Sequence, residues 1–211
     1  MSAHPWASAI AVGQAPENFH VGLVPDDDGR ILYRIYQKTE TGEPAIHSQG
    51  GIEFAEPAES RHDPDALRAA CGMRVATAEQ CYAAFAAKGL MLGASFRAIR
   101  EIHVGDQQAL ARLELPDALA DQAGRFVLHP SMMDGALQAS MGLLIAAGEV
   151  DTRLGLPFAL ERLEILAPTT ARMWSYVRFS AGSQASDRVQ KLDFDLCDDA
   201  GRVCVRFVGL S

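Results

Sequence analysis

The sequence contains few cysteines, no excess of positive charge and no long apolar run, and each absence excludes a class of protein. Its four cysteines form no CxxC pair, and no histidine stands at zinc-finger spacing from Cys71, Cys81, Cys197 or Cys204. We therefore expect free thiols in a reducing cytoplasm and no bound metal. With 19 Lys and Arg against 27 Asp and Glu, the net charge of -8 argues against a nucleic-acid-binding surface. No stretch reaches the length of a membrane span and the first residues lack a signal-peptide pattern, so we expect no membrane association.

The first part of the chain has the alternation of apolar and polar residues that is typical of strands. Apolar residues make up 48% of the 211 residues, which is enough for the core of one domain or of two small ones. Residues 19–24, 31–36 and 45–54 are predicted to form three antiparallel strands, with no helix to cover them. Residues 55–76 lack a clear period and are predicted to be a linker, with one helical turn near residues 63–70.

The remainder of the chain predicts strands arranged around a long helix. Thr77-Ala-Glu-Gln80 is a capping-box pattern, and the helix that it opens is expected to end at Gly89. Six further strands are predicted, over residues 98–103, 108–115, 159–166, 173–179, 189–196 and 203–210. The pattern predicts an α+β fold with a partial sheet in residues 1–57, a linker in 58–76 and a complete unit in 77–211.

A helix over residues 130–147 is expected to lie at the centre of that unit. Pro130 can open the helix because the first helical N–H has no partner to lose. Apolar side chains at helical spacing predict one buried stripe, made of Met133, Leu137, Met141 and Leu144.

Asp134 and Gln138 are four residues apart on this helix and should lie within hydrogen-bonding reach in a common pocket. A carboxyl group so placed can act as a general acid, oriented by the amide one turn later. The alternative is structural, because an Asp in the first turn of a helix is commonly favoured by the helix dipole alone.

Four stretches resemble the dehydratase domains of polyketide synthases. His129-Pro130-Ser-Met-Met-Asp134-Gly-Ala-Leu-Gln138 is similar to the second catalytic motif of that family, and Gly89-Leu-Met-Leu-Gly93-Ala-Ser-Phe96 to its GLxYGPxF segment. In the latter, Leu92 replaces the usual Tyr and Ala94 the usual Pro. The other two stretches resemble the LPF segment and the closing hairpin of the family: Leu156-Pro157-Phe158 followed by Leu163-Glu-Ile165, and Leu192-Asp-Phe-Asp-Leu196 with Asp199-Ala-Gly201. The resemblance runs from about Trp6 to the end of the chain and implies a double hotdog, here with a reduced first half.

The resemblance also implies roles for individual residues. Asp134 matches the family's catalytic acid, and Gln138 matches the residue that hydrogen-bonds it. The substrate would be an acyl chain on the phosphopantetheine arm of an acyl carrier protein, with no other cofactor. Candidate substrate-binding residues are His129, Leu92, Gly93, Pro157 and Phe158. For His129, capping of the helix is the favoured alternative.

The family's catalytic base is a His in an H-x-x-x-G-x-x-x-x-P motif, and no such motif stands in this sequence. None of the six histidines has the spacing; His47 with Gly51 and Pro57 comes nearest, with one residue too many before the proline. The catalytic loop and central helix of the first half are therefore expected to be either naturally missing or outside these 211 residues.

Three functions remain open. The first is a dehydratase-like domain that binds carrier-tethered acyl chains and assists branching, cyclisation or a double-bond shift, with little or no dehydratase activity of its own. The second is a truncated active β-hydroxyacyl-thioester dehydratase, and the third is a structural spacer between ketosynthase and carrier protein. The expected partners are the acyl carrier protein and the ketosynthase of the same module, and the domain could form a homodimer through the parent synthase.

Overall fold

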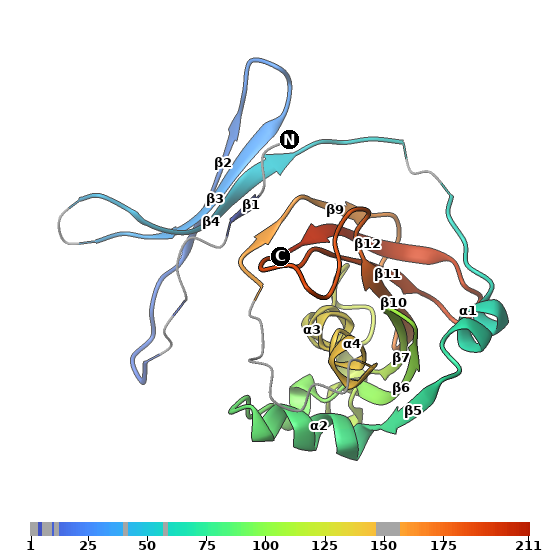
Figure 1. The fold of residues 1–211 in the computed structure, drawn as a ribbon. Coiled ribbons are helices and arrows are strands. Elements are labelled where there is room, and N and C mark those ends of the chain that lie inside the picture. Colours follow the sequence, from blue (N-terminus) through green and yellow to red (C-terminus); the bar gives the residue numbers. More distant parts are fainter. Residues whose placement is uncertain (1–3, 6–9, 11–12, 40–41, 57–58, 147–156) are drawn as a thin grey trace.

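The chain forms a curled antiparallel sheet around two consecutive helices, and a second, smaller sheet beside it (Figure 1). The computed structural model describes residues 4–5, 10, 13–39, 42–56, 59–146 and 157–211. The predicted α+β fold is confirmed. Residues 6–9 of the stretch that begins the resemblance, and Leu156, lie outside the described residues.

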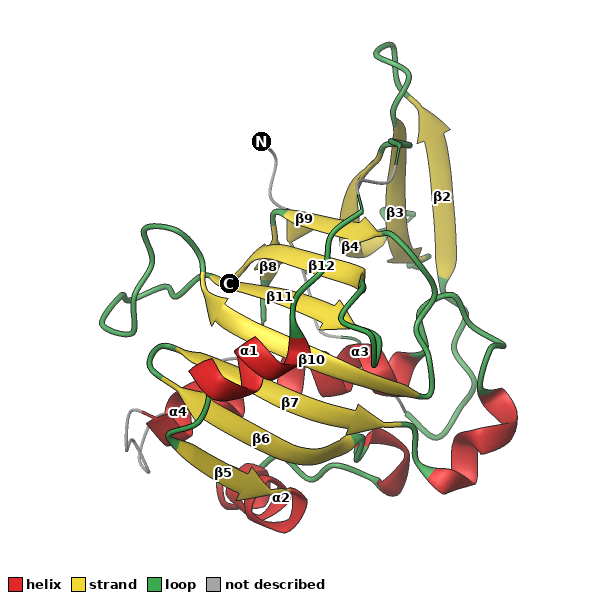
Figure 2. Cartoon of the chain, turned by 90° about the vertical axis from the view of Figure 1, so that its right-hand side faces the viewer, coloured by secondary structure: helices red, strands yellow, loops and turns green. Residues whose placement is uncertain are grey.

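The larger sheet has seven antiparallel strands in the order β5-β6-β7-β10-β11-β12-β9 (Figure 2). The last strand in the sequence, β12, therefore lies between β11 and β9. The bounds are β5 Arg74–Thr77, β6 Ile99–Gly105, β7 Gln108–Glu114, β9 Arg162–Ile165, β10 Arg172–Phe179, β11 Leu192–Cys197 and β12 Val203–Leu210.

Two strand predictions need correction. Part of the predicted linker, residues 74–77, is strand β5 and pairs with β6. The strand predicted over residues 159–166 is split at Glu161 into β8 (Ala159–Leu160) and β9. Strand β8 pairs with β1 (His4–Pro5), whereas β9 pairs with β12, so the two pieces belong to different sheets.

The first two helices begin where the sequence signals indicate. Helix α1 (Pro64–Ala70) is capped by Asp63, whose carboxylate accepts from two backbone N–H groups. Helix α2 (Ala78–Ala87) has the predicted capping box, in which the side chains of Thr77 and Gln80 each accept from the other's backbone N–H. Gly89 follows α2 with a φ of 84°, a conformation that glycine adopts without strain. Of the helices in the described residues, none is long and apolar enough to cross a membrane.

The single helix predicted over residues 130–147 is wrong, because the structure has two helices there. Helix α3 (Pro130–Gln138) and helix α4 (Met141–Ala146) are separated by a turn at Ala139 and Ser140; residue 147 lies outside the described residues. The Ser140 hydroxyl donates to the Leu137 carbonyl at 2.8 Å. A serine hydroxyl that bonds a carbonyl of the preceding turn competes with the helical backbone pattern and favours a bend.

The buried face of α3 also differs from the predicted stripe. Met141 is buried in the core as predicted, and Met133, Leu137 and Leu144 are partly buried and pack against it, but Met132, Gly135, Ala136 and Ala139, which were not predicted, are fully covered. A Cβ on Gly135 would lie 3.0 Å from the Cβ of Ala98, so the sheet approaches the helix at its small residues. The small residues of α3 therefore let the helix approach its neighbours closely, beside the large buried side chain of Met132.

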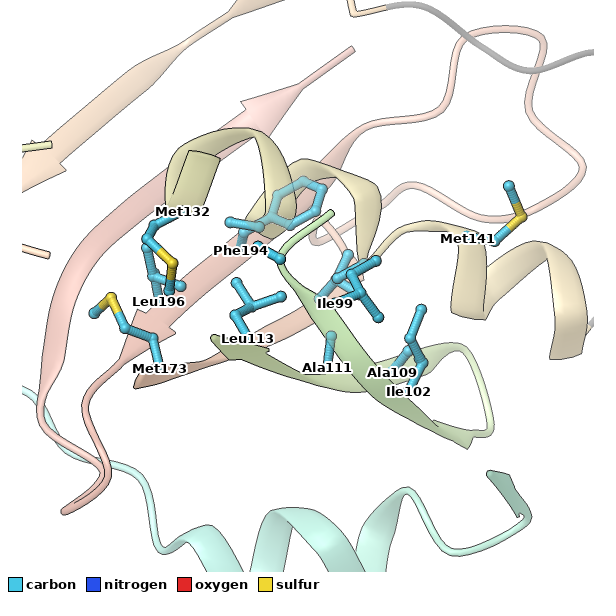
Figure 3. Packing of buried hydrophobic residues seen from close by; sticks show 14 of the residues in the cluster. Ile99, Ile102, Ala109, Ala111, Leu113, Met132, Met141, Met173, Phe194 and Leu196 are labelled. Carbon is cyan, nitrogen blue, oxygen red and sulfur yellow. The ribbon is translucent and has the colours of Figure 1, made fainter. Parts of the chain in front are cut away.

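The inner face of the curled sheet forms one apolar core with α3 and α4 (Figure 3). Met132, Met173 and Leu196 gather at one side of this core, and Ile102 and Ala109 at the other. The outer face carries a smaller cluster, which α1 covers through Leu67 (Figure 2). Its buried members are Cys71, Leu110, Trp174, Cys197 and Val203, and Leu166 and Tyr176 are partly buried against them.

The smaller sheet consists of β2 (His20–Pro25), β3 (Ile31–Gln37) and β4 (Ala45–Ile52), as predicted. Val21 and Leu23 lie opposite Ile35 and Tyr33 on one face of this sheet. Val21 and Leu23 remain 66% and 58% exposed. Figure 1 shows this sheet standing apart from the helices. Within the described residues up to Phe54 the chain has no helix.

Replacing Gly201 by Ala is expected to lower the free energy of unfolding more than a matched change at Gly182. Both glycines have positive φ, 79° and 83°, so both substitutions carry the strain of about 1–2 kcal/mol for a left-handed residue. At Gly201 a Cβ would also collide with the His62 carbonyl oxygen, whereas nothing lies within 4 Å at Gly182. The overlap should add about 1–3 kcal/mol. Urea unfolding of both variants measures the difference; equal losses would contradict the packing described here.

Candidate active site

Helix α3 brings Asp134 and Gln138 into direct contact. The Gln138 Nε2 group donates to Asp134 Oδ2 at 2.6 Å and to the backbone carbonyl of Phe96 at 2.9 Å. Gln138 is only 6% exposed, so both bonds form away from bulk water. The predicted hydrogen-bonding reach is confirmed. That the pair lines a substrate pocket stays a prediction.

The surroundings of Asp134 favour its neutral form. Burial raises the pKa of the Asp134 carboxyl, and the hydrogen bond from Gln138 acts in the opposite direction without cancelling that effect. A carboxyl group with a raised pKa can hold a proton at a higher pH than an exposed aspartate and can donate it to an oxygen nearby. The arrangement can therefore serve as a general acid or as a hydrogen-bond donor to a carbonyl or enolate oxygen.

His129 caps α3 and is fixed in one tautomer by doing so. Its Nδ1 accepts a hydrogen bond from the Ser131 N–H at 3.2 Å, so in the neutral ring the proton sits on Nε2. The backbone N–H of His129 donates to the Thr169 hydroxyl at 2.8 Å, which ties the start of α3 to a neighbouring loop. Burial lowers the pKa of His129. As long as Nδ1 caps the helix, neither ring nitrogen is free to act as a base.

The turn that contains Leu92 and Gly93 is followed by a backbone carbonyl that contacts Gln138. Gly93 precedes the short helix η1 (Ala94–Phe96), and the last residue of η1 supplies the carbonyl that Gln138 contacts. Leu92 packs against the core, and its carbonyl accepts from Arg97 Nε at 3.0 Å. Leu92 and Gly93 thus lie just before the short helix whose last residue contacts Gln138, and their role in substrate binding stays a prediction.

Pro157 and Phe158 lie just before strand β8. Both are exposed, and the Phe158 N–H donates to the Ser211 carbonyl at 2.7 Å, which attaches this segment to the end of β12. No hydrogen bond or ring contact among the described residues joins either of them to Asp134.

Comparison with known proteins decides the family. The family model of the polyketide synthase dehydratase N-terminal domain matches residues 59–211. The chain belongs to the polyketide synthase dehydratase family. The match begins just before α1 and includes every strand of the seven-stranded sheet around this dehydratase-like site.

The relatives of this dehydratase-family chain are large synthases. It is 41% identical over 213 residues to the polyketide synthase PksM of Bacillus subtilis, and 39% identical over 207 residues to PksN of the same organism. Each alignment covers 98% of this chain but only 5% or 4% of the synthase. The chain therefore spans about a twentieth of the length of these relatives.

Solved dehydratase structures share the fold, and the predicted hotdog is confirmed. A trans-AT PKS dehydratase domain from Brevibacillus brevis is 40% identical with a TM-score of 0.90, and the dehydratase domain of RzxB from Pseudomonas fluorescens is 30% identical with a TM-score of 0.83. Each match covers 99% of this chain and 73% of the solved chain.

The site contains a feature that side-chain patterns did not reveal. The Phe96 carbonyl is a backbone acceptor, and backbone acceptors leave no mark in residue type. The signal that could have found it is positional, because Phe96 closes the GLxYGPxF-like segment. Among the described residues, no group of three or more His, Cys, Asp or Glu side chains is placed to hold a metal ion.

Proposed function

We propose that this domain binds an acyl chain carried on the phosphopantetheine arm of an acyl carrier protein and assists a step other than dehydration. Branching, cyclisation and a double-bond shift are the candidate steps. The observation that carries the proposal is the 2.6 Å contact from Gln138 to Asp134, a carboxyl with a raised pKa, in a sequence without the family's His motif. An acid without its partner base can still donate a proton or a hydrogen bond.

Each candidate step places negative charge on the thioester oxygen or on an alkoxide. A neutral Asp134 would hydrogen-bond that oxygen as the charge develops, and such bonds are stronger in a buried site than in water. His129 would not supply the base for α-proton removal, since it is occupied as a helix cap.

The rest of the synthase supplies the context of this proposal. The carrier protein and the ketosynthase of the same module are the proposed partners, in a cytoplasmic synthase that could be a homodimer. Residues 1–57 are proposed to be part of a first hotdog whose remainder belongs to the parent chain. The exposed apolar residues Val21 and Leu23 of β2, and the 73% coverage of solved dehydratase domains, support that assignment.

A truncated active dehydratase is the second candidate. It is favoured by the 40% identity to a solved dehydratase domain, of which this chain covers only 73%. In this case the His base would lie in the part of the parent chain that corresponds to the uncovered portion.

Replacing Asp134 by Ala inside the intact synthase module is expected to change the product, because the acid would be lost while the fold is kept. Mass spectrometry of the released polyketide measures the change, and the exposed residue Asp121, replaced by Ala, is the matched control. Accumulation of an unbranched, uncyclised or unshifted intermediate supports the proposal. Accumulation of a β-hydroxy intermediate supports the active dehydratase, and an unchanged product supports a structural spacer.

A further inference from the structure

A single exposed side chain, Arg97, holds the turn beside the acid against helix α2. Its Nε donates to the Leu92 carbonyl at 3.0 Å, which closes the turn over residues 92–97. Its guanidinium lies over the ring of Tyr82, 5.4 Å from the centroid. The Tyr82 hydroxyl in turn accepts from the Ile99 N–H at 2.8 Å, just after the turn. No carboxylate among the described residues lies at ion-pair distance from Arg97, so its contacts here are the Leu92 carbonyl and the aromatic ring.

The turn presents the Phe96 carbonyl to Gln138, and that carbonyl determines how the amide is oriented. The two N–H groups of Gln138 are both used, one on Phe96 O and one on Asp134 Oδ2. If the amide were rotated by half a turn, its oxygen would face two acceptors, and a backbone carbonyl can never donate a hydrogen bond in return. In the rotated orientation, a protonated Asp134 could donate a hydrogen bond to the amide oxygen. The Phe96 carbonyl has no proton to donate, so it would face that oxygen without a hydrogen bond.

The observed orientation of the Gln138 amide is energetically unfavourable at its oxygen, which supports a constraint from the Phe96 carbonyl. Gln138 Oε1 is buried without a hydrogen-bond partner among the described residues. A buried amide oxygen without a partner is unfavourable, so some stronger constraint must hold the amide this way round. The Phe96 carbonyl is that constraint. With Oδ2 always accepting from Gln138, the proton of a neutral Asp134 resides on Oδ1.

We propose that Arg97 is a positioning residue: by holding the Phe96 carbonyl against Gln138, it keeps the amide N–H on Asp134 Oδ2 and leaves Oδ1 as the oxygen that carries the proton. The role of Asp134 as the acid rests on the proposed function. The mechanical chain from Arg97 through Phe96 and Gln138 to the carboxyl group does not depend on it.

The test is an NMR titration of the Asp134 carboxyl carbon in the whole domain. The bond from Gln138 lowers the pKa of Asp134, so its loss in Gln138→Met should raise that pKa. We expect Arg97→Lys to raise it in the same direction, because Lys keeps the charge but lacks the planar guanidinium that stacks on Tyr82 and reaches the Leu92 carbonyl. The two side-chain amide protons of Gln138 should also lose their protection from exchange in Arg97→Lys.

Two outcomes would overturn the proposal. In the first, Arg97→Lys leaves both the Asp134 pKa and the exchange of the Gln138 amide protons unchanged, while Arg97→Ala raises the pKa. Arg97 would then affect Asp134 only through its positive charge. If Arg97→Lys raises the Asp134 pKa further in a Gln138→Met background, it acts by a route other than the amide. Arg97 is exposed, so both variants should fold, which an amide spectrum otherwise unchanged from that of the unmodified domain will verify.

The titration and the in-module experiment can fail independently. A shifted Asp134 pKa with an unchanged polyketide would keep Arg97 as a positioning residue and remove the proposed function. A changed polyketide in Asp134→Ala with no pKa shift in Arg97→Lys would do the reverse.

Discussion

A β-hydroxyacyl carrier protein incubated with this domain is expected to lose water about 10²- to 10⁴-fold more slowly than with a dehydratase that has both its acid and its base. Dehydration needs a base for the α-proton and an acid for the departing hydroxyl. Asp134 is the proposed acid, but the 211 residues contain no His in the family's base motif. His129 cannot substitute while its Nδ1 caps α3. Intact-protein mass spectrometry, which detects the loss of one water, measures the rate.

The same assay separates the two enzymatic readings of the chain. Rapid loss of water that Asp134→Ala abolishes would show that a base is supplied by a residue that we have not recognised. Slow loss that becomes rapid in a longer piece of the parent synthase would identify the truncated dehydratase. Slow loss in both would favour a non-dehydrating role.

Replacing Asp195 by Ala is expected to lower the free energy of unfolding by about 1–3 kcal/mol, because it leaves the partly buried donor groups of Arg206, Arg178 and His62 without their partner. Asp195 of β11 is fully buried, and its carboxylate contacts Arg206 Nε at 2.6 Å, His62 Nε2 at 2.8 Å and Arg178 Nη1 at 3.1 Å. Burial alone would raise the pKa of Asp195, but the hydrogen bonds from His62 and Arg206 and the charge of Arg178 lower it to about 2. Urea unfolding at neutral pH measures the loss.

An exposed carboxylate provides the control. Asp199 also pairs with two arginines, Arg112 and Arg172, but at the surface, where such pairs contribute about 0–1 kcal/mol. A carboxylate with a lowered pKa stabilises the fold above its unfolded pKa of about 3.9, and this contribution is lost as the pH falls towards the folded value of about 2. Asp195→Asn should therefore weaken the pH dependence of unfolding in that window. Equal losses for Asp195→Ala and Asp199→Ala would contradict the role of the buried network.

The strands could be predicted because their signal is local. Alternation in β2 and β3 is visible within a few residues, as is the capping box of α2. Strand β5 has four residues, of which only Ala76 is buried, so it lacks the alternation that marks a half-buried strand. The division of residues 130–146 into α3 and α4 was missed because Ser140 bonds a carbonyl, a choice that its residue type permits but does not require.

Only the contacts of the candidate site that lie within one helix could be predicted from the sequence. Asp134 and Gln138 are four residues apart, so their contact follows from the geometry of one helix. The contact of Gln138 with Phe96 spans 42 residues, and that of His62 with Asp195 spans 133. Contacts at such separations depend on how the strands are ordered in the sheet, which the pattern of a single sequence does not specify.

The position of β12 has a consequence for synthesis on the ribosome. Strand β9 pairs with no other strand of the seven-stranded sheet, so it has no hydrogen-bonding neighbour there until β12 has emerged. The segment around His62, which leaves the exit tunnel much earlier, likewise waits for Gly201, whose carbonyl accepts from the His62 N–H. Strand β9 and the segment around His62 therefore remain without these partners until residues 201–210 are released. The seven-stranded sheet is therefore completed only after translation of its own final strand, although the consecutive pairs β5-β6 and β6-β7 can form earlier.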